Sequence, residues 1–113
     1  MYKLILKEEI ISAIDDFVDN FLYSSINLYV DTWIRDIDLI IKNYETSALL
    51  FRDKIYDTLE EKFIQDNILW KKISENNQLS VIVPVWNYRL FVDFWEDESQ
   101  RLRMIENIEF YKK

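Results

Sequence analysis

Carboxylates are the side chains of this sequence whose types and spacing best suit chemistry. Asp53, Asp57 and Glu61 recur every fourth residue. A helix would place them on one face, where neighbouring like charges cost about 0.2–0.5 kcal/mol per pair. A cationic partner would relieve that repulsion and would be steered towards the line. With a second acidic group, they form the surface that we predict for a basic partner: Asp15, Asp16, Asp19, Asp53, Asp57 and Glu61.

The same carboxylates are oxygen ligands of the kind that divalent cations prefer. The fragments with the best spacing for a metal are Asp36 with Asp38, Asp53 with Asp57, and residues 60–62. None of them completes a set of ligands, and such fragments are frequent in a chain with 31% charged residues. We therefore expect no metal, no cofactor and no catalysis. A carboxylate-based, metal-dependent enzyme is the third hypothesis.

The residue types that the chain lacks exclude many enzyme classes. It has no His, no Cys and no Gly. Without His and Cys it lacks the commonest general base, the usual zinc ligands and any disulfide. Without Gly it has no phosphate-binding loop, no dinucleotide-binding fingerprint and no nucleophile elbow, because each needs Gly where the backbone approaches closely.

Residues 80–96 crowd β-forming residues around a turn and predict a hairpin. With Asn87 and Tyr88 as the turn, alternate residues point to opposite faces. One face is then wholly apolar, and it contains three cross-strand pairs: Val85 with Leu90, Val83 with Val92, and Val81 with Phe94.

The second face of this hairpin is aromatic and partly charged. It carries residue types that dominate interface hot spots, namely Trp86, Arg89, Phe91 and Trp95. Two interpretations remain open. Helices cover this face as the second side of a sandwiched sheet, which is the more ordinary arrangement, or it binds a partner or a second copy of the chain.

Apolar repeats of three and four residues predict three helices before the hairpin. The first runs from Glu8 to about Tyr23. The second begins at a capping Ser24 or Ser25 and follows a coiled-coil-like seam over 26–44, with a strand over 26–30 as the alternative. The third begins at Thr46 or Ser47, ends near Asp66, and repeats an apolar residue every fourth position: Phe51, Ile55, Leu59 and Phe63.

The remaining segments are short. Residues 2–7 alternate as a strand that would pair with the hairpin, 68–73 is either a helical turn or a strand, and 74–78 is a loop. After the hairpin, Asp97 with Gln100 resembles a capping box and predicts a last helix, with a strand over 104–110 as the alternative. We therefore predict one α+β domain over 1–113, with N-terminal helices packed on a small antiparallel sheet centred on the 80–96 hairpin and with a C-terminal helix or edge strand.

Charge divides the chain. Residues 1–66 hold 14 acids and 7 bases, whereas residues 67–113 hold 7 of each, so the net charge of −7 lies on the predicted helices. Such a surface disfavours direct binding to nucleic acid. No apolar run approaches the roughly 18–20 residues of a membrane span, and the N-terminus does not resemble a secretory signal. We expect a soluble, cytoplasmic protein.

Composition and charge lead to two main hypotheses. Phe, Tyr, Met, Ile, Asn and Lys make up 49 of the 113 residues, a bias towards AT-rich codons that is typical of many viruses and low-GC microbes. The preferred hypothesis is a small acidic interaction protein that blocks a basic protein in the host cytoplasm, as a viral anti-defence or immunity-type inhibitor does. The alternative is a structural or oligomer-forming module, such as a homodimer joined through its aromatic face, whose acids only keep it soluble.

Overall fold

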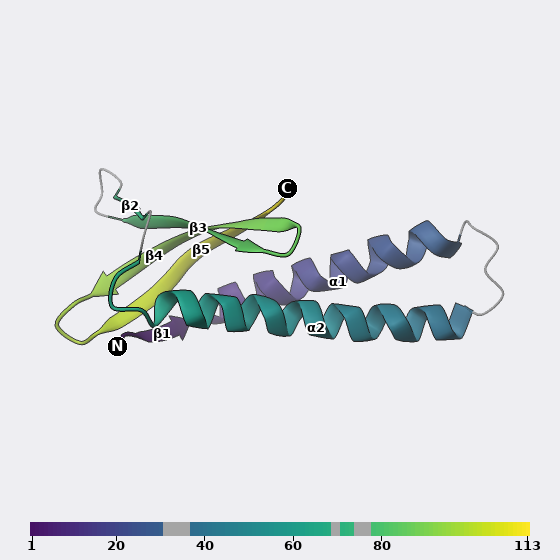
Figure 1. Cartoon of the computed structure of the whole chain (residues 1–113), viewed down its shortest axis with the longest axis horizontal. Helices are drawn as coiled ribbons and strands as arrows, with labels where there is room; N and C mark the ends of the chain where they lie inside the picture. The colour runs from purple at the N-terminus through teal and green to yellow at the C-terminus, as the bar shows by residue number, and fades with distance from the viewer. Residues whose placement is uncertain (31–36, 69–70, 74–77) are drawn as a thin grey trace.

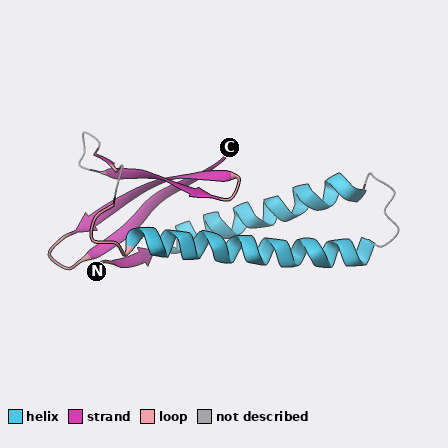
Figure 2. Cartoon of the chain, in the orientation of Figure 1, coloured by secondary structure: helices cyan, strands magenta, loops and turns pink. Residues whose placement is uncertain are grey.

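The computed structural model describes residues 1–30, 37–68, 71–73 and 78–113. Two long helices lie on one side of a β-sheet in a molecule of 58 × 24 × 23 Å (Figure 1). Colouring by secondary structure separates the helical layer from the sheet layer (Figure 2). The elements are β1 (Lys3–Leu6), α1 (Glu8–Val30), α2 (Ile37–Phe63), β2 (Lys72–Ile73), β3 (Leu79–Val85), β4 (Tyr88–Asp97) and β5 (Leu102–Lys112). The predicted α+β class with N-terminal helices is confirmed.

The sheet has the strand order β1-β5-β4-β3-β2 and is mixed. Strand β1 runs parallel to β5, from Lys3 opposite Leu102 to Leu6 opposite Ile105, while the other neighbours are antiparallel. The predicted N-terminal strand therefore exists, but its partner is β5 and not the 80–96 hairpin. The ambiguous segment 68–73 ends in strand β2, and residues 74–77 of the predicted loop lie outside the described residues.

Strands β3 and β4 form the predicted hairpin with a different turn. The turn residues are Trp86 and Asn87, so Val85 pairs with Tyr88 and Val83 pairs with Leu90. The predicted pairing was wrong by two residues. Because side chains alternate with a period of two, that shift leaves each residue on its expected face. All six apolar residues of the predicted core face are buried: Val81, Val83, Val85, Leu90, Val92 and Phe94.

Aromatic packing against α1 and α2 explains this turn. The Tyr88 ring meets those of Phe17 and Phe51 edge-on, with centroids 5.1 and 5.4 Å apart. The Trp86 ring lies 4.9 Å from that of Phe51. Trp86 has a φ of 52°, as the first position of a two-residue type II′ turn requires. That left-handed conformation costs on the order of 1–2 kcal/mol in a residue with a Cβ, and the ring contacts offset it.

The described residues before the hairpin form two helices where three were predicted. Helix α1 continues through Ser24 and Ser25 to Val30, so neither the break nor the alternative strand over 26–30 exists. Helix α2 likewise passes through Thr46, whose hydroxyl donates to the Lys42 carbonyl at 3.0 Å instead of capping a new helix. The chain has no Gly and one Pro, outside the helices, so no strong helix breaker acts here. Of the predicted 26–44 seam, residues 31–36 lie outside the described residues.

The predicted helical stripes form the core. Every member of the four-residue repeat of α2 is fully buried, and α1 adds Ile10 and Ile14. These side chains pack with the apolar face of the β3–β4 hairpin and with Ile105 and Ile108 of β5 in one cluster. The helices therefore cover one face of the sheet, which we call the inner face.

The C-terminal segment is a strand and not the predicted helix. Strand β5 lies between β1 and β4, so it is not an edge strand along its first four residues either. The Asp97 carboxylate accepts hydrogen bonds from Ser99 Oγ at 2.6 Å, Ser99 N at 3.0 Å and Gln100 N at 3.2 Å. This is the bonding of a helix cap, but Arg101 follows with a φ of 55° and turns the chain into β5.

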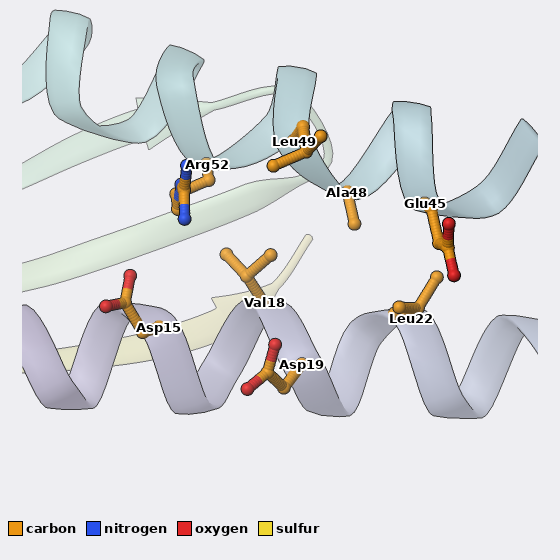
Figure 3. Close-up of a pocket in the computed structure, with 8 residues that line it drawn as sticks. All are labelled: Asp15, Val18, Asp19, Leu22, Glu45, Ala48, Leu49 and Arg52. Carbon is orange, nitrogen blue, oxygen red and sulfur yellow. The ribbon is translucent and has the colours of Figure 1, made fainter. Parts of the chain in front are cut away.

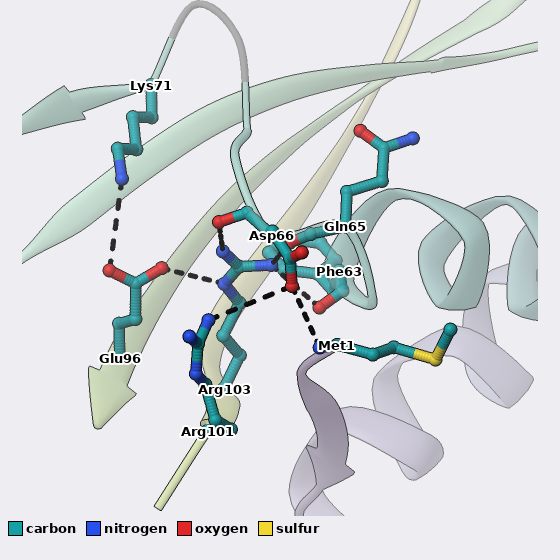
Figure 4. A network of polar contacts seen from close by, with 8 residues as sticks. All are labelled: Met1, Phe63, Gln65, Asp66, Lys71, Glu96, Arg101 and Arg103. Carbon is teal, nitrogen blue, oxygen red and sulfur yellow. Dashed lines mark hydrogen bonds and ion pairs between the residues drawn. The ribbon is translucent and has the colours of Figure 1, made fainter. Parts of the chain in front are cut away.

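One buried arginine joins the sheet to the end of α2. Arg103 of β5 is fully buried, and it is the only buried charged or polar residue in the described part of the chain. Its Nε donates to Glu96 Oε1 at 2.7 Å (Figure 4). Its terminal nitrogens donate to the backbone carbonyls of Phe63 at 2.9 Å, Asp66 at 3.2 Å and Gln65. The last carbonyls of a helix lack intrahelical donors. Arg103 supplies a donor to the Phe63 carbonyl at the end of α2 and to two carbonyls of the segment that follows.

Further contacts surround this arginine. The guanidinium lies 3.7 Å from the centroid of the Tyr2 ring, a cation–π contact. Lys71 reaches Glu96 at 3.8 Å, and the amino group of Met1 lies 2.8 Å from the Asp66 carboxylate. The hydrogen bond and the positive charge of that amino group hold the pKa of Asp66 below its usual range. We call Arg103 and these partners the arginine clamp.

Replacing Arg103 by Met should destabilise the protein by about 3–5 kcal/mol, because the substitution leaves the buried Phe63 carbonyl without its donor and leaves Glu96 with only Lys71, 3.8 Å away. Arg101→Met is the matched control. Arg101 is half exposed and lies 3.7 Å from Asp66, so its loss should cost less than about 1 kcal/mol. Urea unfolding measures both values. Equal losses for the two variants would show that the buried clamp does not hold the fold.

Acid should weaken the fold below about pH 4. The pKa of Asp97 is lowered by the Ser99 hydroxyl and by the backbone N–H groups, and that of Asp66 is lowered by the amino terminus. Because both pKa values are below the unfolded value of about 3.9, this stability is present above that pH and is lost as pH falls through the folded-state values. Asp97→Asn should flatten the acid limb of a stability-versus-pH curve. Glu98→Gln, which alters an exposed neighbour, should not.

Candidate functional site

A groove lies between α1 and α2 with a volume of about 260 Å³ (Figure 3). Val18 and Ala48 point towards each other across it and are buried. Charged side chains lie beside these apolar ones. The groove is lined by Asp15, Val18, Asp19 and Leu22 of α1 and by Glu45, Ala48, Leu49 and Arg52 of α2.

Helical spacing brings the charged groups of the groove together. Asp15 and Asp19 lie one turn apart on α1, and Glu45 and Arg52 lie two turns apart on α2, so each pair occupies one side of its helix. Three carboxylates and one guanidinium thus line the groove, and its rim carries a net charge of −2 at neutral pH. The apolar residues supply most of the remaining lining. The groove is therefore suited to a group that is apolar along its length and positive at its end.

Tyr56 sits beside the groove on α2. Its hydroxyl donates a hydrogen bond to the Asp15 carboxylate at 3.3 Å. Partial burial raises the pKa of Tyr56, and the neighbouring charge of Asp15 raises it further. This bond orients the Asp15 carboxylate next to the groove.

The structure brings together only part of the predicted acidic surface. Asp15 and Asp19 line the groove, whereas Asp16 is exposed on α1 outside it. The line of Asp53, Asp57 and Glu61 is exposed along α2, and its helical positions fall opposite the buried stripe of that helix. The line and the groove are two separate acidic features of the helical layer.

Glu45 and Arg52 were missed as groove residues. The predicted break between a seam ending at residue 44 and a helix beginning at Thr46 or Ser47 separated Glu45 from Arg52, so the two were not predicted to lie on one side of a single helix. Their spacing of seven residues would have shown it in a continuous helix.

The face of the sheet opposite the helices, which we call the outer face, carries the second candidate site. Its Phe91 and Trp95 expose 37% and 44% of their surface, and Arg89 is also exposed. The described helices do not cover this face (Figure 1), so the more ordinary arrangement, a sheet sandwiched by helices, is wrong. Six of the described apolar residues of this face form what we call the outer patch: Ile5, Ile82, Phe91, Trp95, Met104 and Tyr111.

Two aromatic residues are placed differently from the prediction. Trp86 lies in the hairpin turn with its ring against Phe51 of α2, so it is not part of the outer patch. Tyr111 belongs to the patch, because its ring meets that of Phe91 at 4.8 Å. The prediction of a C-terminal helix hid Tyr111, whereas the alternation of residues 102–112 as a strand places it beside Arg89.

Polar side chains cross the middle of the outer face and are internally paired. Ser80 Oγ donates to Asp93 Oδ1 at 2.6 Å across the β3–β4 pair. Lys7 forms an ion pair with Glu106 at 2.7 Å. We call these four residues the polar belt. It separates the part of the outer patch near the hairpin turn from the part near β1.

Within the described ranges, no three Asp, Glu, His or Cys residues lie close enough to hold a metal ion. Of the metal fragments predicted from the sequence, Asp36 lies outside those ranges. No described helix is long and apolar enough to cross a membrane.

Comparison with known proteins adds no further constraint. No family model matches the chain, and no curated protein or solved structure matches it significantly.

Asp15→Asn should lower the pKa of Tyr56, because it removes the negative charge that stabilises the protonated phenol. The pKa should stay above that of free tyrosine, since burial is the larger cause. A pH titration of the Tyr56 ring carbon by NMR measures this value separately from the other six tyrosines. Asp16→Asn is the control, and an equal shift in both variants would contradict the geometry of the groove.

Proposed function

We propose that this chain is a small, acidic, non-enzymatic interaction protein that binds a basic protein through its helical layer and blocks it, as a viral anti-defence or immunity-type inhibitor would. The groove between α1 and α2 carries this proposal. It combines an apolar lining with three carboxylates, and it lies on the half of the chain that holds the whole net charge.

The size and chemistry of the groove favour a single long basic side chain. Sites for small molecules usually have volumes of about 300–1,000 Å³, and the groove has about 260 Å³. Lys and Arg have an apolar stem and a charged head. The stem would pack on Val18, Leu22 and Ala48, and the head would meet Asp15, Asp19 or Glu45.

The acidic line of α2 has a different role in this proposal. Asp53, Asp57 and Glu61 are exposed to solvent, where charges contribute little to affinity but increase the rate of encounter with an oppositely charged partner. Their field extends over about 8 Å at physiological salt. The same charges disfavour nucleic acid as the direct partner. We expect the partner, and hence this protein, in the cytoplasm, which is the host cytoplasm if the chain is viral.

The uncovered outer face favours the alternative function, a structural or oligomer-forming module. In that case the acids of the helices only solvate the protein. The alternative predicts that neutralising the groove changes no binding, so one experiment separates the two functions.

Capture from a host lysate at rising salt tests the proposal, with two triple variants that remove the same charge. The groove variant is Asp15→Asn with Asp19→Asn and Glu45→Gln, and the line variant is Asp53→Asn with Asp57→Asn and Glu61→Gln. A basic protein should bind the wild type and be released by moderate salt. The captured protein is then purified and its binding measured. The Kd of its complex with the groove variant should be about tenfold or more higher than with the wild type, whereas the line variant should mainly slow association.

Unfolding curves accompany these measurements. The line variant should be as stable as the wild type or more stable by up to about 1 kcal/mol, because it removes unfavourable i,i+4 pairs. Loss of binding in the line variant alone would place the binding site on the solvent-exposed side of α2, at the acidic line, and not in the groove. Unchanged binding in both variants, or no basic protein captured, would contradict the proposed function.

A further inference from the structure

We propose that the outer patch is the interface of a homodimer, in which two sheets pack face to face and the helical layers lie on the outside. The proposal rests on the sheet and not on the acidic groove, so it stands or falls independently of the basic partner.

The exposed apolar area matches that of a stable dimer. Phe91, Trp95 and Tyr111 expose 37%, 44% and 48% of their surface. At roughly 150–250 Å² for each aromatic side chain, they offer about 200–300 Å². A standard interface buries about 800 Å² per partner, of which roughly 450 Å² is apolar. The three rings thus supply about half of the apolar area, and Ile5, Ile82 and Met104 bring the patch close to the whole.

The charges of the outer face favour a second copy as the occupant. This face carries three bases, Lys3, Lys7 and Arg89, and four acids, Asp93, Asp97, Glu106 and Glu109. These seven residues have a net charge of −1, whereas residues 1–66, which include both helices, have a net charge of −7. Two copies of an acidic protein repel each other, and this repulsion is weaker across the outer face, where bases nearly offset the acids, than across the acidic helices. A strongly charged partner would gain nothing here.

The polar belt carries one carboxylate, Asp93, for which the described residues show no ion pair, and this is a cost that the apolar parts of the patch must offset. Buried charges are costly when a partner is missing. Here Asp93 already accepts a hydrogen bond from Ser80, and Glu106 is already paired with Lys7. A two-fold axis in the plane between the sheets places belt against belt, whether the axis runs along the strands or across them. The apolar parts on either side of the belt then meet apolar parts of the partner.

This arrangement also keeps the acidic surfaces apart. Packed sheets lie about 10 Å from each other, and each helical layer lies on the far side of its own sheet (Figure 2). The exposed acids of the two α2 helices are then separated by more than the roughly 8 Å over which charges interact at physiological salt.

Analytical ultracentrifugation tests the dimer with variants matched for exposure. At about 100 µM the wild type should sediment as a dimer, because interfaces of this size have micromolar or lower Kd values. Phe91→Glu and Trp95→Glu should each raise the dimer Kd by about tenfold or more, the loss typical of an interface aromatic. Leu49→Glu and Leu50→Glu alter leucines of α2 that are 53% and 58% exposed, and these variants should remain dimeric.

Spin labels give a second measurement that does not depend on weakening the interface. The chain has no Cys, so a single introduced Cys labels one site per copy. Labels at Asn107, beside the belt on β5, should be closer to each other than labels at Asp57 on α2. Any of three results would overturn the proposal: a monomeric wild type, dimer Kd values raised equally by the leucine and the aromatic variants, or a longer distance between labels at Asn107 than between labels at Asp57. A monomer whose patch is covered by a different molecule falls under the first of these.

Discussion

The buried guanidinium of Arg103 is the contact on which the relation between the two layers depends. A charge removed from water is tolerated only when its hydrogen bonds are complete. Here Glu96, the Phe63 carbonyl at the end of α2 and the Gln65 and Asp66 carbonyls just after it complete them. The end of α2 is therefore fixed above β4 and β5. The amino-terminal residues are held at the same place. The Tyr2 ring covers the guanidinium, and the backbone N–H of Tyr2 donates to the Ile64 carbonyl at 3.1 Å. From this fixed end, the apolar stripe of α2 extends over the inner face.

The number and length of the helices and strands leave the molecule with two different surfaces, one on the helical layer and one on the outer face of the sheet. Helix α2 has 27 residues and is about 40 Å long, whereas the longest strand, β5, has 11 residues and spans about 36 Å. The helical pair therefore extends beyond the sheet (Figure 1). With two helices and one sheet, one face of the sheet has no layer against it in the described structure. The acidic groove and the outer patch consequently lie on opposite sides of the same core, and a partner on one need not obstruct the other.

Local patterns in the sequence predicted which face of a helix or strand is buried better than they predicted the turns and helix ends that connect these elements. The α2 stripe and the hairpin core face followed from periodicity, because burial on one side determines the spacing of apolar residues. The turns did not follow, since Asp97 hydrogen-bonds in the same way in a helix cap and in a turn, and Thr46 can satisfy its hydroxyl inside a helix. Without Gly, the turns also carry no marker for positive φ, which falls on Trp86 and Arg101. Arg103 was not predictable because its backbone partners lie about 40 residues away.

Segregation of charge gives the two surfaces opposite responses to salt. Ions screen the attraction between the acidic helices and a basic partner, so that contact weakens as salt rises. Ions equally screen the repulsion between two copies of net charge −7, while the neutral outer patch gains its free energy from apolar area, which salt does not screen. Association through the sheet should then be unchanged or tighter at high salt. If both proposed contacts form, they are therefore distinguishable in the same solution, because salt would dissociate one and preserve the other.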